Sequence, residues 1–208
     1  MQDLINEIIE EVLDRVKKEA FIQVEASGRH VHLSKEHVEA LFGYGYKLNK
    51  AKDLSQPGQY ACKERVMIVG PKGTLKNVVV LGPERKETQV EISLTDSNVL
   101  GVKVPIRQSG DLKNTPGLKI LANDNVVNLE NGAICARRHV HITNEDANKF
   151  KVSDNQVVSV KVFGERPLVF DDVVVRVSDN FNTSMHIDYD EANACGFSKG
   201  TLGRILKK

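Results

Sequence analysis

The chain has 208 residues, with 29 basic against 28 acidic side chains and 5% aromatic residues. This near-neutral balance excludes a bulk electrostatic surface for nucleic acid or an acidic membrane, so an anionic ligand has to be held by local groups. No apolar run approaches the ~20 residues of a membrane span, and the first residues lack the basic and apolar regions of a secretory signal. We therefore expect an intracellular, cytoplasmic protein without nucleic-acid or membrane partners.

The first predicted element is an amphipathic helix over residues 3–19, where apolar side chains recur at three- and four-residue spacing among charged ones. No linker rich in Gly, Pro or Ser separates this segment from the strand predicted at residues 22–26. The missing linker favours a helix docked on its own domain. A targeting or assembly helix that packs against a partner is the alternative.

The most informative motif is Arg-His-x-His, which occurs at residues 29–32 and again at residues 138–141. Side chains two residues apart on a β-strand point to the same face, so the two imidazoles of each pair can bind one cation. Imidazole suits zinc, copper, iron or nickel, and zinc is the default where thiolates are not clustered. The motif therefore predicts two metal sites.

Each histidine pair precedes a predicted helix, which Ser34 caps in the first case and Thr143 in the second. The rest of the chain is typical of short strands separated by Gly, Pro and Asn/Asp turns, which favours barrels or sandwiches. No Gly-x-Gly-x-x-Gly or Walker-type loop supports a nucleotide fold. Strands are expected at residues 66–69, 76–81, 89–94, 102–106, 132–135, 156–162 and 173–177.

Two histidines leave a zinc site short of ligands, because such sites use three or four protein groups. His186, flanked by two apolar residues as a strand ligand would be, is the candidate third ligand for the second pair. Glu91, which alternates with apolar neighbours, is the candidate for the first pair. A solvent-facing histidine and a solvated strand glutamate are the alternatives.

Sites with three protein ligands and an open position are catalytic in character. Four arginines near the motifs could bind phosphate, because guanidinium groups match its oxygens, although a salt bridge at a strand edge is the alternative for each. Cys135 lies close to the second histidine pair and is a candidate nucleophile, but an inert buried cysteine is the commoner case. The four arginines are Arg29, Arg85, Arg137 and Arg138.

Together these motifs resemble the propanediol-utilisation type of phosphate acyltransferase, also called the phosphate propanoyltransferase family. The resemblance runs from about residue 22 to the C-terminus. It is carried by Arg-His-Val-His-Leu-Ser at 29–34, Gly-Pro-x-Arg at 82–85 with Glu91 six residues later, Arg-His-Val-His-Ile at 138–142 and Met-His-Ile-Asp at 185–188.

The resemblance implies an enzyme with two zinc ions that moves a short acyl group, propanoyl or acetyl, reversibly between coenzyme A and orthophosphate. Its substrates and products would be acyl-CoA and phosphate, acyl phosphate and CoA. The implied residues are His30, His32 and Glu91 for the first zinc, His139, His141 and His186 for the second, Arg85 as the catalytic, phosphate-binding arginine, and Ala26, Ser27, Gly28, Lys72 and Asn193 for coenzyme A.

The implied fold is mainly β: two small β-barrels capped by short α-helices, with an N-terminal amphipathic helix over residues 1–18. One barrel would combine residues 19–28 with 137–208, the other would take residues 29–136, and the active site would lie between them. We expect a homo-oligomer, in the first instance a dimer. Some family members involved in propanediol degradation carry an N-terminal peptide that directs them into a bacterial microcompartment, and residues 3–19 resemble such a segment.

Two other functions compete with the acyltransferase. A bicupin, a metal-dependent oxygenase or isomerase, is suggested by Glu36 and Glu145, which follow the histidine motifs at nearly cupin-like spacing. Both glutamates fall in the first turn of a capped helix, where acidic side chains favour the helix dipole, whereas a cupin ligand lies on a strand. A non-catalytic assembly protein with structural zinc would instead require closed sites with four ligands.

Overall fold

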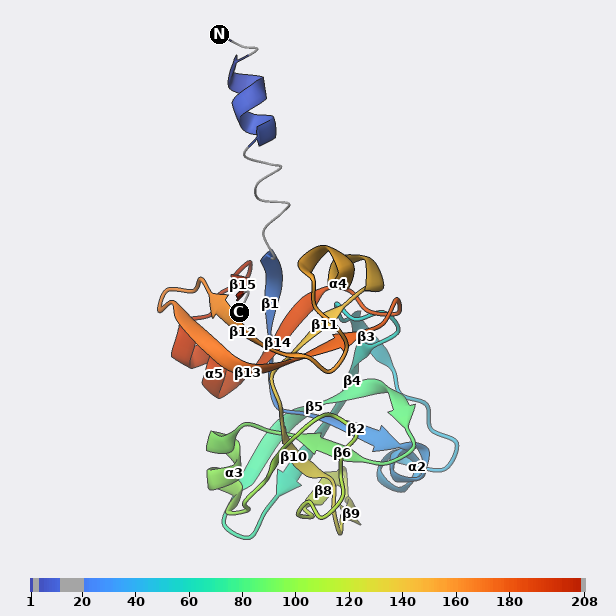
Figure 1. Ribbon diagram of the computed structural model, residues 1–208. Helices are drawn as coiled ribbons and strands as arrows, with labels where there is room; N and C mark the ends of the chain where they lie inside the picture. The colour runs from blue at the N-terminus through green and yellow to red at the C-terminus, as the bar shows by residue number, and fades with distance from the viewer. Residues whose placement is uncertain (2–3, 12–20, 207–208) are drawn as a thin grey trace. The chain divides into compact units, whose positions relative to one another are not determined.

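The computed structural model describes residues 1, 4–11 and 21–206 (Figure 1). Residues 4–11 are helical, in agreement with the prediction, and the rest of that predicted helix, residues 12–19, lies outside the described residues. The chain divides into two compact units. Unit 1 comprises Met1–Ala26, Arg138–Ile187 and Glu191–Lys208, and unit 2 comprises Ser27–Arg137 and Asp188–Asp190.

Unit 1 contains a closed barrel in which β1, the first strand of the chain, pairs antiparallel with β15, the last. Alternate residues of the barrel strands are fully buried in its core, including Val140, Ile142, Met185 and Ile187. The strand order is β1 (Phe21–Ser27), β14 (Ser184–Asp188), β11 (His139–Ile142), β13 (Leu168–Val177), β12 (Val157–Val162) and β15 (Leu202–Leu206).

Unit 2 contains a nine-stranded sheet with its own hydrophobic core. The central strands of the sheet contribute Val31, Leu33 and Val90 to this core. Together with the barrel, this sheet confirms the predicted mainly β fold. The order is β7 (Ile106–Arg107), β10 (Ala133–Ala136), β6 (Gln89–Glu91), β2 (His30–Ser34), β5 (Thr74–Arg85), β4 (Tyr60–Val69), β8 (Lys119–Ala122) and β9 (Asn125–Asn128), and β3 (Lys50–Asp53) pairs with β4.

Short helices follow the strands that carry the motifs. The predicted caps are confirmed: the hydroxyl of Ser34 accepts a hydrogen bond from the His37 amide at 3.2 Å, and that of Thr143 accepts one from the Asp146 amide at 3.1 Å. None of the helices within the described residues is both long and apolar enough to span a membrane. The helices are α2 (Lys35–Phe42), α3 (Leu94–Leu100), α4 (Asn144–Phe150) and α5 (Tyr189–Cys195).

Three of the predicted strands are longer in the structure, as β4, β5 and β13, and two others are too long as predicted. The strand expected at residues 89–94 ends at Glu91, because Ser93 caps α3 and its hydroxyl accepts a hydrogen bond from the Asp96 amide at 3.2 Å. Of the strand expected at residues 102–106, only Ile106 belongs to a strand. The sequence Ser93-x-x-Asp96 is a helix-start signal that the apolar alternation before it obscured.

We expect the substitution Ile142→Ala to lower the free energy of unfolding of unit 1 by about 3 kcal/mol, because this fully buried side chain would leave a cavity in the barrel core. Denaturant unfolding followed by circular dichroism measures the change. Val169→Ala is the control in the same unit, because Val169 is about half exposed and its loss should change stability by less than about 0.5 kcal/mol. Equal effects of the two substitutions would contradict the assigned core.

Candidate functional site

The first candidate metal centre combines His30 and His32 of β2 with Glu91 of β6. The two strands are antiparallel, and their register places Glu91 directly opposite His30. The Glu91 Oε2 atom lies 3.4 Å from His30 Nε2, and Oε1 lies 3.9 Å from His32 Nε2. The Nδ1–H of His30 donates to the Gly28 carbonyl at 2.8 Å, which leaves Nε2 as the ligand atom.

All three side chains are buried, and their charges depend strongly on one another. Burial opposes a charge on Glu91, but His30, His32 and Arg85 outweigh burial and hold the pKa of this carboxyl well below its usual range. Burial also opposes a charge on His30, but the adjacent Glu91 outweighs it and raises the pKa of His30. Burial, followed by the charge on His30, lowers the pKa of His32 to about 3. The group thus offers a carboxylate and a neutral imidazole, the forms that bind metal.

A hydrogen-bond network connects Glu91 to Arg85. The Gln89 amide Nε2 donates to Glu91 Oε1 and also to Ser109 Oγ, at 2.8 Å in the second case. Ser109 Oγ donates to Glu91 Oε1 at 3.0 Å and accepts from the Arg85 guanidinium at 3.0 Å. These contacts on Oε1 orient the carboxylate, and they place a guanidinium one hydroxyl group away from a candidate metal ligand.

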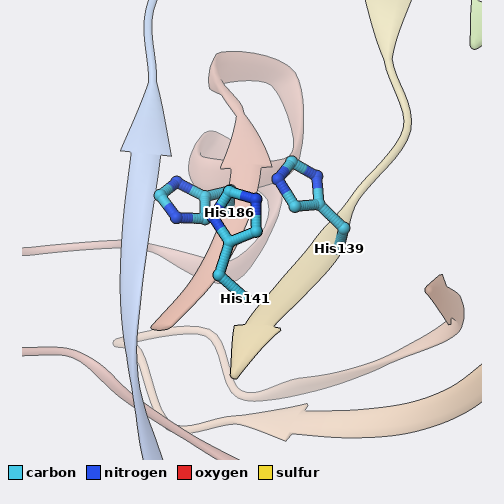
Figure 2. Close-up of side chains that lie close together, drawn as sticks. All are labelled: His139, His141 and His186. Carbon is cyan, nitrogen blue, oxygen red and sulfur yellow. The ribbon is translucent and has the colours of Figure 1, made fainter. Parts of the chain in front are cut away.

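The second candidate centre combines His139 and His141 of β11 with His186 of β14 (Figure 2). The register places His186 directly opposite His139. The ring centroid of His139 lies 4.6 Å from that of His141 and 5.1 Å from that of His186. The centroids of His141 and His186 are 4.8 Å apart. Figure 2 shows the three rings gathered in one place, two from one strand and one from its neighbour.

The surroundings of the second centre keep His141 neutral. Burial, followed by the nearby His139 and His186, lowers the pKa of His141 to about 2. The Nδ1 atom of His141 is buried without a hydrogen-bond partner among the described residues. The ring of Phe181 stacks on the His141 ring, with 4.1 Å between the two centroids. A buried nitrogen of this kind is costly unless something binds it, which fits a metal-ligand set.

The two groups have the composition of open metal sites. In each, the candidate ligand atoms lie within 4.8 Å of one another, and each group has three ligands. Within the described residues, these are the two places where three or more side chains of metal-ligand type meet in this way. The structure thus brings together all six predicted metal ligands in the predicted sets.

Arg29 and Arg138 are candidate phosphate-binding arginines with acidic partners. Arg29 forms an ion pair with Asp96 at 2.8 Å, and Arg138 forms one with Glu191 at 2.6 Å. The salt-bridge alternative therefore holds for these two residues. Arg85 remains the candidate whose guanidinium is connected to a metal ligand, through Ser109.

The residues implied for coenzyme A are distributed over both units. Ala26 and Ser27 end β1, and Gly28 follows them; a Cβ atom on Gly28 would lie 2.8 Å from the ring of Tyr189, so only glycine fits there without a shift. Lys72 lies in the turn between β4 and β5 in unit 2, and Asn193 lies on α5 in unit 1. Their role in binding coenzyme A stays a prediction.

Sequence reasoning missed Gln89, Ser109 and Ser184. Ser184 Oγ lies 3.1 Å from His186 Nε2, and it occupies in the second centre the position that Gln89 occupies in the first, two residues before the third ligand. The two-residue periodicity of a strand could have identified both, because they share a face with the ligand that follows them. Ser109, 18 residues beyond Glu91, has no comparable local signal.

The chain is similar over nearly its whole length to known proteins that share one name. The family model "Phosphate propanoyltransferase" matches residues 23–198. A protein of that name from Clostridioides difficile (strain 630) is 67% identical to the chain over 100% of both chains. One from Listeria monocytogenes serovar 1/2a is 60% identical over 99% of this chain and 97% of its own. One from Enterococcus faecalis is 58% identical over 99% of this chain and 98% of its own. The chain therefore belongs to the phosphate propanoyltransferase family, a family of acyltransferase enzymes.

Proposed function

We propose that the chain uses two zinc ions to catalyse the reversible transfer of a propanoyl or acetyl group between coenzyme A and orthophosphate. The observation that carries this proposal is the connection of Arg85, through Ser109, to Glu91 in the first ligand set. A fixed guanidinium beside an open metal site suits a reaction in which a phosphate anion meets an activated carbonyl. Acyl transfer to or from phosphate is the family's reaction.

Zinc is the metal that the ligands favour. The first set offers two imidazoles and a carboxylate, and the second offers three imidazoles. Both are ligand sets of catalytic zinc sites, which keep one position open for water or substrate. Zinc has no redox chemistry of its own, in keeping with a group transfer in which nothing is oxidised. Zinc, when bound, polarises a carbonyl group or stabilises a thiolate.

Arg85 binds the phosphate and orients it for attack. An oxygen of the held phosphate adds to the carbonyl carbon of the thioester, and the carbon–sulfur bond then breaks. The products are acyl phosphate and the coenzyme A thiolate. Holding both reactants in one geometry removes much of the entropic barrier of a two-substrate reaction. The preorganised positive charge of the guanidinium stabilises the oxyanion of the tetrahedral intermediate.

The cysteines do not favour an acyl-enzyme. Cys135 is buried and its thiol donates to Asp188 Oδ2 at 3.3 Å, and Cys195 is fully buried. Burial raises the pKa of Cys195, and it raises that of Cys62 to about 11. A thiol that stays protonated is a poor nucleophile, so direct attack by phosphate is the route that we propose.

Coenzyme A itself would contact the end of β1 at Ala26, Ser27 and Gly28, with Lys72 and Asn193 as further contacts. The protein would act as a homo-oligomer, in the first instance a dimer.

The N-terminal segment would serve as an address for a bacterial microcompartment in the cytoplasm. Its described part, residues 4–11, is a helix whose apolar side chains are about half exposed. An exposed apolar stripe on a helix is typical of a segment that binds a partner. The exposed side chains are Leu4, Ile5, Ile8 and Ile9.

The two competing functions have less support. Glu36 and Glu145 lie in the first turns of α2 and α4, not on strands, and neither belongs to a ligand set. A bicupin would need both as strand ligands. A purely structural zinc site closes with four protein ligands, whereas each set here has three among the described residues.

Zinc removal and the substitution His139→Ala should both abolish transfer. We expect the purified protein to contain two zinc ions per chain and to form acyl phosphate from propanoyl-CoA and phosphate, a reaction followed by release of the free thiol. Loss of one imidazole should lower kcat by at least about 1,000-fold, because metal stabilisation of developing charge is worth several kcal/mol. His37→Ala is the control, because His37 bonds to Thr88 outside both sets. A fully zinc-loaded protein without transfer activity would refute the proposal.

The substitution Arg85→Ala should weaken the use of phosphate and leave zinc in place. Loss of a charge-assisted contact of about 2 kcal/mol corresponds to a rise of about 30-fold in the KM for phosphate. Steady-state kinetics measures the KM, and elemental analysis measures the zinc. Lys86→Ala, which removes the neighbouring exposed cation, should leave the KM within about twofold. Loss of zinc in Arg85→Ala, with an unchanged KM, would assign this arginine to the metal set instead.

Deletion of residues 1–19 should leave the transfer rate within about twofold of the full chain if the segment is only an address, because a targeting helix adds no catalytic group. The rate, the zinc content and the melting temperature of the shortened protein test this. Aggregation or loss of folding on deletion would show that the segment is structural.

A further inference from the structure

The two ligand sets are built on the same plan within their separate units. In each, a strand with two histidines lies between a parallel neighbour and an antiparallel one, and the antiparallel neighbour carries the third ligand. The third ligand is paired with the first histidine in both registers: Glu91 with His30, and His186 with His139. The plan therefore repeats at the level of strand pairing.

The repeat extends to one ion pair beside each set. An arginine immediately precedes the first histidine, and an acidic residue follows the third ligand after five positions. Arg29 binds Asp96 at 2.8 Å, and Arg138 binds Glu191 at 2.6 Å. Asp96 lies near the start of α3 and Glu191 near the start of α5, so each pair joins the beginning of the histidine strand to the helix after the third-ligand strand.

The acidic partners are more deeply placed than those of an ordinary surface pair. The exposed fraction of the side chain is 6% for Asp96 and 17% for Glu191. By comparison, the Lys50–Asp53 pair in unit 2 exposes more than half of both side chains. Arg138 has further contacts: its Nε donates to the Asp171 carbonyl at 2.7 Å, and its guanidinium lies over the ring of Phe170. A buried carboxylate needs its cation, which holds the two chain segments together.

We propose that Arg29–Asp96 and Arg138–Glu191 are equivalent positioning pairs, each of which fixes the relative placement of the three ligands in the neighbouring set. The inference rests on the proposed function, because it takes both sets to bind zinc. The hydrogen bonds between the strands set which residues face one another. The ion pair adds a second connection, between the start of the histidine strand and the helix that follows the third-ligand strand. Neither arginine contacts the ligand atoms, so both act through the histidine that follows.

The test measures zinc affinity at each site separately. A His141→Ala background reports on the first site and a His32→Ala background reports on the second, each by competition with a chromophoric chelator. We expect Arg29→Gln to weaken zinc binding at the first site about tenfold, because the loss of an indirect partner has an effect of this size in other metal sites. Zinc affinity at the second site should change by less than about twofold. Arg138→Gln should do the reverse. Asp96→Asn and Glu191→Gln should match their partners, and each double variant should be no weaker than its weaker single variant.

Lys50→Gln is the matched control, because it removes the cation of an exposed ion pair and should alter neither site. The melting temperature of the zinc-free variants serves as a separate readout of the fold. A variant that loses affinity at both sites together with melting temperature would make the pair a general structural element and overturn the inference. If the parent chain binds zinc and the variants bind it with unchanged affinity at both sites, the inference is also overturned. Failure of the parent chain to bind zinc at all would instead refute the proposed function, and the inference with it.

Discussion

The register between the histidine strand and its antiparallel neighbour is the constraint on which both ligand sets depend. It places Glu91 opposite His30 and His186 opposite His139. A slip of one residue would turn the third ligand to the core face and expose an apolar side chain in its place. The buried alternation of Val31 and Leu33 in one unit, and of Val140 and Ile142 in the other, opposes that slip. Core packing thus holds the ligands in place.

The two sets differ in how they accommodate buried polar groups. Glu91 keeps its charge because the adjacent His30, His32 and Arg85 outweigh burial. His30 faces its Oε2 atom, and Gln89 and Ser109 donate to Oε1. The second set has three imidazoles and no carboxylate ligand, and burial holds His141 in its neutral form. One set therefore contains a carboxylate connected to Arg85 through Ser109, and the other contains imidazoles alone.

Local periodicity explains why so much of the site could be predicted. The spacing of two residues in a strand identified both histidine pairs, and alternation with apolar neighbours made Glu91 and His186 candidates for the third position. The caps at Ser34 and Thr143 have equally local signals. The helix α3 was missed because the apolar pattern of β6 continues across its cap, so the strand was extended to Leu94.

The sequence by itself determined the candidate ligand types and their pairing on strands, because these follow from side-chain identity and from spacing of a few residues. The acyltransferase function followed from the resemblance of the combined motifs to a known family. Only the tertiary structure decided which remote groups support the candidate ligands. Ser109 reaches Glu91 from 18 residues away, and Arg29 and Arg138 are joined to acids on distant helices rather than left for phosphate. Such contacts depend on the register and packing of strands far apart in the chain, for which no local pattern carries a signal.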